Sequence, residues 1–297
     1  MDVTTATAGL WRFPFNAMAS PCEVLLEGDR TTAAAIAAEA IAEVRRIEEK
    51  YSRYRQQSVT STINRTAGSP MSVDSETAAL LDYAATCYQL SEGKFDITTG
   101  PLRYLWKFTD AATLPDSAEV TALLPHIGWQ RIRWQNPHLT LQPKMEIDLG
   151  GIGKEYAVDR AIALIKNMTT AAALVNLGGD LAVTGPRQHG QRWQIALENP
   201  DHHQNRLTAE AHLNVTISHG ALATSGDTYR HIKSHGERYG HILNPQTGWP
   251  IRNAPRSITV AAATALEAGM LSTMASLQGA AAKAFLQAQG VPYWLVR

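Results

Sequence analysis

The segment 148–159, which reads DLGGIGKEYAVD, decides how the middle of the chain folds. An apolar run enters a turn that holds Gly150, Gly151 and Gly153, and a helix is expected to follow. Backbone N–H groups in such a turn can approach an anion closely, and both the helix N-terminus and Lys154 add positive charge. The segment is no Walker A loop, because no Ser or Thr follows the lysine, and it lacks the third glycine of the dinucleotide fingerprint. It therefore predicts either a phosphate-binding turn or simply a tight connection from strand to helix.

Hydrophobic periodicity on both sides of this segment predicts an α+β fold, because helices and strands mix without regular βαβ spacing. The expected helices run from a cap at Thr31 or Thr32 to about Tyr51, from a cap at Asp74 or Ser75 to about Ser91, from about Glu155 to Asn167, and from about Leu266 to Gln287. The expected strands are 22–27, 131–134, 139–141, 145–149, 193–197, 213–218 and 256–261, with a hairpin around Gly178-Gly179. A loop is expected at 68–73 and a turn at 224–227.

The composition is that of an ordinary globular protein: 297 residues, of which 44% are hydrophobic and 18% charged. The 27 basic and 27 acidic residues balance, which argues against a nucleic-acid or membrane-surface binder. Cys22 and Cys87 form no metal-binding pair and are expected to be small buried hydrophobes. We expect a cytoplasmic protein, because no apolar run approaches the roughly 20 residues of a membrane span and neither a signal peptide nor a lipid-attachment cysteine is apparent.

One histidine among the ten stands in an unusual setting. His241 precedes the rigid turn Asn244-Pro245, and such a turn can position an imidazole in the way that a general base needs. Most histidines have no such role, but the Pro, Gly and aromatic residues nearby favour His241 over the others. The segment 224–227 offers two hydroxyls and a carboxylate, which is a weak signal when taken alone.

Taken together, these segments resemble the ApbE family of FAD:protein FMN transferases, in family order, over roughly residues 16–280. Met18-Ala19-Ser20-Pro21 resembles the family's M-G-T-P, and 94–102 (KFDITTGPL) with Leu105-Trp106 resembles F-D-[PI]-T-V-G-P-L-x-x-L-W. Residues 52–64 resemble S-x-Y-R-x-x-S-x-[IL]-S-x-[IFL]-N, and 148–159 resembles D-L-G-G-I-A-K-G-Y-A-V-D. The stretches 176–180, 224–227 and 241–248 follow in the same order.

The resemblance implies an α+β architecture with the flavin site between its two parts. It implies a transferase domain over residues 16–290, preceded by an N-terminal extension over residues 1–15. Family members bind FAD, cleave its pyrophosphate and transfer FMN to a Thr or Ser hydroxyl of an acceptor flavoprotein, with release of AMP. Such chemistry depends on positioning and charge neutralisation, normally with Mg²⁺. FAD as substrate, Mg²⁺ and a flavin-carrying acceptor protein are therefore expected; nucleic acid and an integral membrane segment are not.

The resemblance also assigns site residues. His241 matches the general base that takes the proton of the acceptor hydroxyl. Gly151, through its backbone carbonyl, and Thr273 match metal ligands. The positions that match FAD contacts are Met18, Tyr54, Lys94, Phe95, Asp96, Asp148, Lys154 and Ile242. For Tyr54 and Phe95, core packing is the alternative interpretation.

One departure from the family concerns the metal. The family has A-D-A-L-S-T at the start of the last helix, whereas this chain reads AGMLST at 268–273, so that Gly269 stands where the usual metal-binding Asp would be. Glu267 would face the other side of that helix, since two residues correspond to about 200° of rotation. Asp180 or Asp227 would have to approach from another loop. Mg²⁺ prefers carboxylate oxygens, so we expect weakened metal binding and expect Gly269→Asp to raise metal-dependent activity.

Glu155 is a second departure, because the family often has Gly there. Its charge would either repel the phosphates of FAD or help to hold a metal. These departures leave two alternatives to an active FMN transferase. One is a catalytically impaired FAD-binding carrier or regulator, and the other is an FAD pyrophosphatase that gives FMN and AMP.

Overall fold

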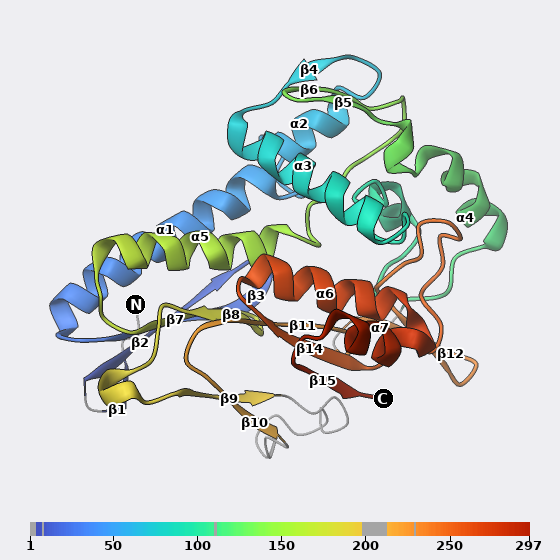
Figure 1. Ribbon diagram of the computed structural model, residues 1–297. Helices are drawn as coiled ribbons and strands as arrows, with labels where there is room; N and C mark the ends of the chain where they lie inside the picture. Colours follow the sequence, from blue (N-terminus) through green and yellow to red (C-terminus); the bar gives the residue numbers. More distant parts are fainter. Residues whose placement is uncertain (1–3, 8, 110–111, 198–212, 229) are drawn as a thin grey trace.

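An eight-stranded antiparallel sheet forms the centre of the computed structural model, which describes residues 4–7, 9–109, 112–197, 213–228 and 230–297 (Figure 1). The strand order is β1-β2-β3-β7-β8-β11-β14-β15. The bounds are β1 Thr4–Thr7, β2 Leu10–Ala17, β3 Ser20–Glu27, β7 Ala173–Leu177, β8 Asp180–Val183, β11 Gly220–Gly226, β14 Ser257–Ala262 and β15 Tyr293–Val296. Segments before residue 16 and after residue 290 therefore both contribute strands to this sheet.

Three helices cover one face of the sheet, namely α1 (Arg30–Tyr51), α5 (Gly153–Met168) and α6 (Ala265–Leu277), and α7 (Ala282–Gln289) follows α6 (Figure 1). The apolar positions of α1 that recur at helical spacing are buried, so the predicted amphipathic stripe is the face that packs on the core. Within the described residues, no helix combines the length and the apolarity needed to cross a lipid bilayer.

A two-stranded ribbon covers the opposite face of the sheet. It consists of β9 (Trp193–Leu197) and β10 (Leu213–Ile217), which pair antiparallel and lie below the sheet in Figure 1. Trp193 and Val215 from the ribbon join Leu174, Leu181 and Leu222 from the sheet in one buried apolar cluster. The sheet is therefore packed on both faces.

A second part of the molecule lies on the far side of the helices (Figure 1). It contains α2 (Val59–Arg65), α3 (Ser75–Leu90), α4 (Ser117–Leu123) and a small sheet of order β4-β6-β5 with bounds Met71–Ser72, His138–Thr140 and Arg133–Gln135. A further two-stranded ribbon pairs β12 (His231–Ser234) with β13 (Glu237–Gly240). Short 3-10 turns lie at Gly100–Tyr104, Leu124–His126, Trp129–Arg131, Gln188–Gly190 and Gly279–Ala281. Leu102, Trp106, Ile127 and Ile232 form a separate buried cluster.

The α+β prediction is confirmed, and most predicted elements are found, but several expectations are wrong. The carboxylate of Asp29 caps α1 by accepting from the N–H groups of Thr31 (3.1 Å) and Thr32 (3.0 Å), so neither threonine is the cap. The predicted last helix is interrupted at Gly279, whose φ of +58° is left-handed. Residues 224–226 belong to strand β11 rather than to a turn.

The segment 145–149 is not a strand either, although its residues alternate between buried and half-buried. The side chain of Asn64 takes the place of a neighbouring strand: its Oδ1 accepts from the N–H of Ile147 (2.8 Å) and its Nδ2 donates to the carbonyl of Ile147 (3.0 Å). Helix α2, which carries Asn64, was not expected, and its short length gives little periodicity to detect. Strands β1, β2, β12, β13 and β15 and helix α4 were also not expected.

Candidate functional site

Helices α5 and α6 run antiparallel beside one another, and a carboxylate fixes their alignment. Asp159 in α5 accepts hydrogen bonds from the N–H groups of Ala265 (2.8 Å) and Leu266 (2.9 Å), the first residues of α6. Residues four apart lie on one helix face, so the next turn brings Glu155 of α5 opposite Gly269 of α6. A Cβ atom at Gly269 would lie 2.5 Å from Cγ of Glu155, which confirms this alignment.

The glycine-rich turn precedes α5 directly. The N–H of Gly150 donates to Oδ1 of Asp148 (2.9 Å), and the N–H of Gly153 donates to the carbonyl of Leu149 (2.8 Å). Gly151 is exposed, and a Cβ atom there would lie 3.3 Å from the ring of Phe95. The turn is therefore a tight connection into α5 in which Gly151 is exposed to solvent.

Lys154, in the first turn of α5, forms an ion pair with Asp180 at the start of β8 (2.6 Å). Asp180 is buried, and its Oδ1 also accepts from the backbone N–H of Thr224 (2.9 Å). Burial acts to lower the pKa of Lys154, but the charges of Asp180 and Glu155 outweigh it, and the net shift is upward. Lys154 is therefore a protonated cation, anchored by strand β8 next to the glycine-rich turn.

Glu155 is only 8% exposed, and its Oε2 has no hydrogen-bond partner. Burial, and then the charge of Asp180, raises the pKa of Glu155 to about 8. Unpaired carboxylates are rarely buried in this way, because the lost hydration is not replaced. Glu267, in contrast, is exposed and its Oε2 accepts from the N–H of Ala263 (3.2 Å), so it faces away from this place, as predicted.

A cluster of hydroxyls lies at the next turn of α6. Ser225 Oγ, near the end of β11, lies 2.8 Å from Ser272 Oγ and 2.9 Å from Thr273 Oγ1. Thr273 is four residues beyond Gly269, so it extends the same helix face toward the glycine-rich turn. Sequence reasoning selected Thr273 from the family motif, whereas Ser225 gave only a weak signal, as one of the two hydroxyls of the segment 224–227.

His241 lies on the loop that follows β13 and is braced by two aromatic residues. Its ring meets that of Phe108 edge-on, with centroids 6.3 Å apart. Trp106 Nε1 donates to the carbonyl of Gly248 (2.8 Å), which ties the loop to the segment that carries the KFDITTGPL motif. The Nδ1 atom of His241 is buried without a partner. Burial, and then the charge of Arg230, lowers the pKa of His241 to about 4, so the imidazole is neutral at pH 7 and its Nδ1 or Nε2 atom can accept a hydrogen bond.

Asp227 is close enough to His241 for its negative charge to act on the pKa of that histidine, although burial has the larger effect. Its Oδ2 accepts from Arg238 Nε (2.7 Å), while Oδ1 is buried without a partner. Asp180 and Asp227 thus both reach this region, but each is already neutralised by a cation.

Tyr54 is 77% exposed, which rules out the core-packing interpretation for this residue. Arg53 stacks over its ring at 5.0 Å and also pairs with Asp148, the residue that caps the glycine-rich turn. An exposed aromatic ring held beside a cation is suited to stacking on a flat ligand. Phe95 is buried instead, so its role is to support Gly151.

The other residues that match FAD contacts are held in different ways. Lys94 Nζ donates to Oε1 of Gln278 at the end of α6 (2.6 Å). Met18 forms the β2–β3 turn with a φ of 52°, and its N–H donates to Oε1 of Glu48 (2.6 Å). Ile242 is half-buried against the main core.

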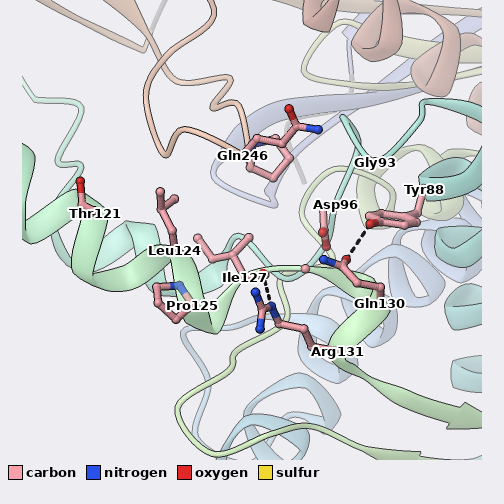
Figure 2. A pocket seen from close by; sticks show the side chains of 12 residues that line it. Tyr88, Gly93, Asp96, Thr121, Leu124, Pro125, Ile127, Gln130, Arg131 and Gln246 are labelled. Atoms are coloured by element: carbon pink, nitrogen blue, oxygen red, sulfur yellow. Dashed lines mark hydrogen bonds between the residues drawn. The ribbon is translucent and has the colours of Figure 1, made fainter.

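Asp96 is buried and hydrogen-bonded within the protein. Its carboxylate accepts from the N–H groups of Thr98 (2.8 Å) and Trp129 (2.9 Å), and burial raises its pKa. Both carboxylate oxygens are engaged, so the chain uses Asp96 to order its own loops. The aspartate also borders a hollow of about 480 Å³, which Figure 2 shows between Tyr88, Gln130, Ile127 and Gln246. Gly151, Lys154 and His241 do not line this hollow.

The structure thus brings the glycine-rich turn, Lys154, Thr273 and His241, which are far apart in the sequence, to one region. Two observations fit a divalent cation there. Glu155 has a buried carboxylate oxygen without a partner, and Gly269 leaves open the space that this carboxylate fills. Within the described residues, no group of three or more His, Cys, Asp or Glu is placed to hold a metal, so any cation would need other oxygens as well.

Comparisons with known proteins identify the family of this chain. The model of the ApbE family matches residues 18–295. An FAD:protein FMN transferase of Vibrio cholerae is 30% identical over 240 residues, which cover 78% of this chain and 70% of the relative, and one of Salmonella typhimurium is 32% identical over 226 residues, which cover 73% and 63%. The chain thus spans about two thirds of the length of these relatives.

Solved structures extend the comparison to the whole fold. The ApbE protein of Thermotoga maritima superposes with a TM-score of 0.86 at 28% identity, and covers 96% of this chain and 94% of its own. The flavin transferase ApbE of Vibrio cholerae gives a TM-score of 0.80 at 25% identity, with 96% and 93% covered.

Proposed function

This chain belongs to the ApbE family, and we propose that it is an FAD:protein FMN transferase, as its curated relatives are named. The observation that carries the proposal is the meeting of a protonated lysine, a neutral histidine and a glycine-rich helix start at one place. Lysine and the helix N-terminus attract phosphate oxygens, and the histidine can remove a proton.

The reaction forms one bond and breaks one. The hydroxyl oxygen of a Thr or Ser in the acceptor protein attacks the phosphorus of the FMN half of FAD. The bond between that phosphorus and the bridging oxygen breaks, and AMP leaves with the oxygen. His241 takes the proton of the attacking hydroxyl. Lys154 and the N–H groups at the start of α5 hold the phosphate oxygens, and Tyr54 stacks on a ring of the dinucleotide.

A divalent cation, Mg²⁺ in the expected case, would neutralise charge on the pyrophosphate. The carbonyl of Gly151 and the hydroxyl of Thr273 are the oxygens that would hold it. We place the flavin between the sheet with its covering helices and the second part of the molecule, in a transferase domain that spans residues 16–290 and follows an N-terminal extension over residues 1–15. The cytoplasmic location stays a prediction, which cell fractionation would test.

One assay separates the candidate functions. The protein is mixed with FAD, Mg²⁺ and a Thr-containing acceptor domain, and covalent flavin is read as fluorescence of the acceptor band in a denaturing gel. We expect a labelled acceptor and one AMP for each label. AMP and free FMN without labelling would identify a pyrophosphatase. Bound FAD without AMP or label would identify a carrier or regulator and refute the proposal.

A further inference from the structure

Glu155 forms no ion pair among the described residues, and its buried Oε2 atom has no hydrogen-bond partner. Asp180 is paired with Lys154, and Asp227 is paired with Arg238. A residue that is 8% exposed and carries an unpaired carboxylate oxygen requires a reason, because such burial is unfavourable on its own. Binding of a cation by the carboxylate of Glu155 is such a reason.

The position of Glu155 depends on Gly269. A Cβ atom at residue 269 would lie 2.5 Å from Cγ and 2.8 Å from Oε1 of Glu155, so the side chain fills the place that any other residue at 269 would take. Asp159, one turn further along α5, fixes the register through its two bonds to the start of α6. The carboxylate of Glu155 in α5 therefore lies against α6 at Gly269.

Thr273 lies one turn beyond Gly269 on the same face of α6. Because Glu155 lies against Gly269, its carboxylate and the hydroxyl of Thr273 are next to the same face of α6, one turn apart. The hydroxyl keeps a free lone pair while it bonds to Ser225, 2.9 Å away. Carboxylate, hydroxyl and carbonyl oxygens are the ligands of hard cations, and Mg²⁺ completes such sites with waters and substrate phosphates.

We propose that Glu155 supplies the carboxylate of a divalent-cation site, in the place of the aspartate that is missing at position 269. The hydroxyl of Thr273 and the backbone carbonyl of Gly151 are the other protein ligands of this site. This inference rests on the proposed function for the role of the cation in the reaction. Binding of the cation can be measured without any turnover. The inference also corrects the expectation for Gly269→Asp: that change alone would collide with Glu155 and crowd two carboxylates together, so it is not expected to raise activity.

The test measures Mn²⁺ affinity of the full chain by electron paramagnetic resonance titration in the presence of ADP, with no acceptor and no FAD. We expect Glu155→Gln to weaken Mn²⁺ binding at least about tenfold, because loss of a group that merely supports a metal ligand already costs about 10–100-fold in affinity. The double variant Glu155→Gly with Gly269→Asp moves the carboxylate from one helix to the other, and we expect it to recover most of the affinity. Glu267→Gln, which removes an exposed acid of the same helix, is the matched control and should leave the affinity unchanged.

Several results would overturn the proposal. One is unchanged Mn²⁺ affinity in Glu155→Gln, which would make Glu155 a neutral buried acid; another is a parent chain that binds no Mn²⁺ with ADP. A Glu155→Gln variant that has lost its circular dichroism signal is replaced by Glu155→Asp, which keeps the carboxylate on a shorter arm and should bind with intermediate affinity. Labelling of the acceptor is measured separately, so a chain that binds Mn²⁺ through Glu155 but labels nothing refutes the proposed function and leaves this inference intact.

Discussion

Asp159 should be a main determinant of how α6 is placed, although it touches no substrate in the proposed mechanism. Its carboxylate accepts two N–H groups of the first turn of α6, at 2.8 and 2.9 Å. Hydrogen bonds to a charged group contribute about 1.5–3 kcal/mol each. Burial raises the pKa of Asp159, so part of this gain is offset by the lost hydration of the carboxylate. We therefore expect Asp159→Ala to lower the free energy of unfolding by about 2–3 kcal/mol.

Urea unfolding followed by circular dichroism measures this change. With a slope of about 3 kcal/mol per M, the midpoint should fall by about 1 M. Thr264→Ala is the control, because Thr264 caps the same helix through one bond to the N–H of Glu267 (3.1 Å), and loss of such a cap costs about 1 kcal/mol. Asp159→Ala should also weaken Mn²⁺ binding, since Glu155 and Gly269 lose their alignment, whereas Thr264→Ala should not. A change of less than about 0.5 kcal/mol in Asp159→Ala would refute the reasoning.

Three further predictions concern the site and the fold. His241→Ala should lower FMN transfer by about 10²–10⁴-fold and leave FAD binding intact, and transfer that stays at the parent rate would exclude His241 as the base. Tyr54→Ala should weaken FAD roughly 5- to 150-fold in a fluorescence titration, whereas Tyr104→Ala, also exposed and stacked with an arginine, should not; equal losses would contradict a stacking role. Arg46 holds the pKa of Glu76 well below its ordinary value of 4.5, so this pair stabilises the fold above that value and the contribution is lost as the pH falls. The melting temperature should therefore fall on acidification below about pH 4.5, and less so in Glu76→Gln; identical curves for both proteins would count against the pair.

The elements that were predictable from the sequence carry their information locally. Helix α1 was evident because its apolar residues recur at helical spacing, and the β7–β8 hairpin was evident from Gly178-Gly179 between two apolar runs. Lys154 and His241 were indicated by their local sequence, whereas the other site residues could be selected only because several short motifs resemble one family in the right order. Neither kind of signal predicted that strand β11 lies inside the large sheet, because its sequence GALATSG is small and polar at one end.

Contacts between distant segments explain the other errors. The side chain of Asn64 pairs with the backbone of Ile147 on one side of the segment 145–149. On the other side the segment forms only an isolated bridge, between Glu146 and Thr99, which is too short for a strand. Asp159 was visible as the last residue of a motif, but its partners at the start of α6 are more than one hundred residues away. No periodicity or spacing within either segment reveals such a pair.

Positions 155 and 269 illustrate the same limit for function. Considered one at a time, Gly269 indicates a lost metal ligand and Glu155 indicates a charge that would repel phosphates. The structure places them against each other, and the absence of a side chain at one position is what admits the carboxylate of the other. The two differences from the family motifs, Gly269 and Glu155, are then one exchange. The carboxylate comes from α5 instead of α6, and its oxygen atoms stay in the same region. It follows that substituting either position alone should be more harmful than exchanging both, since each single change leaves the region with no carboxylate or with two.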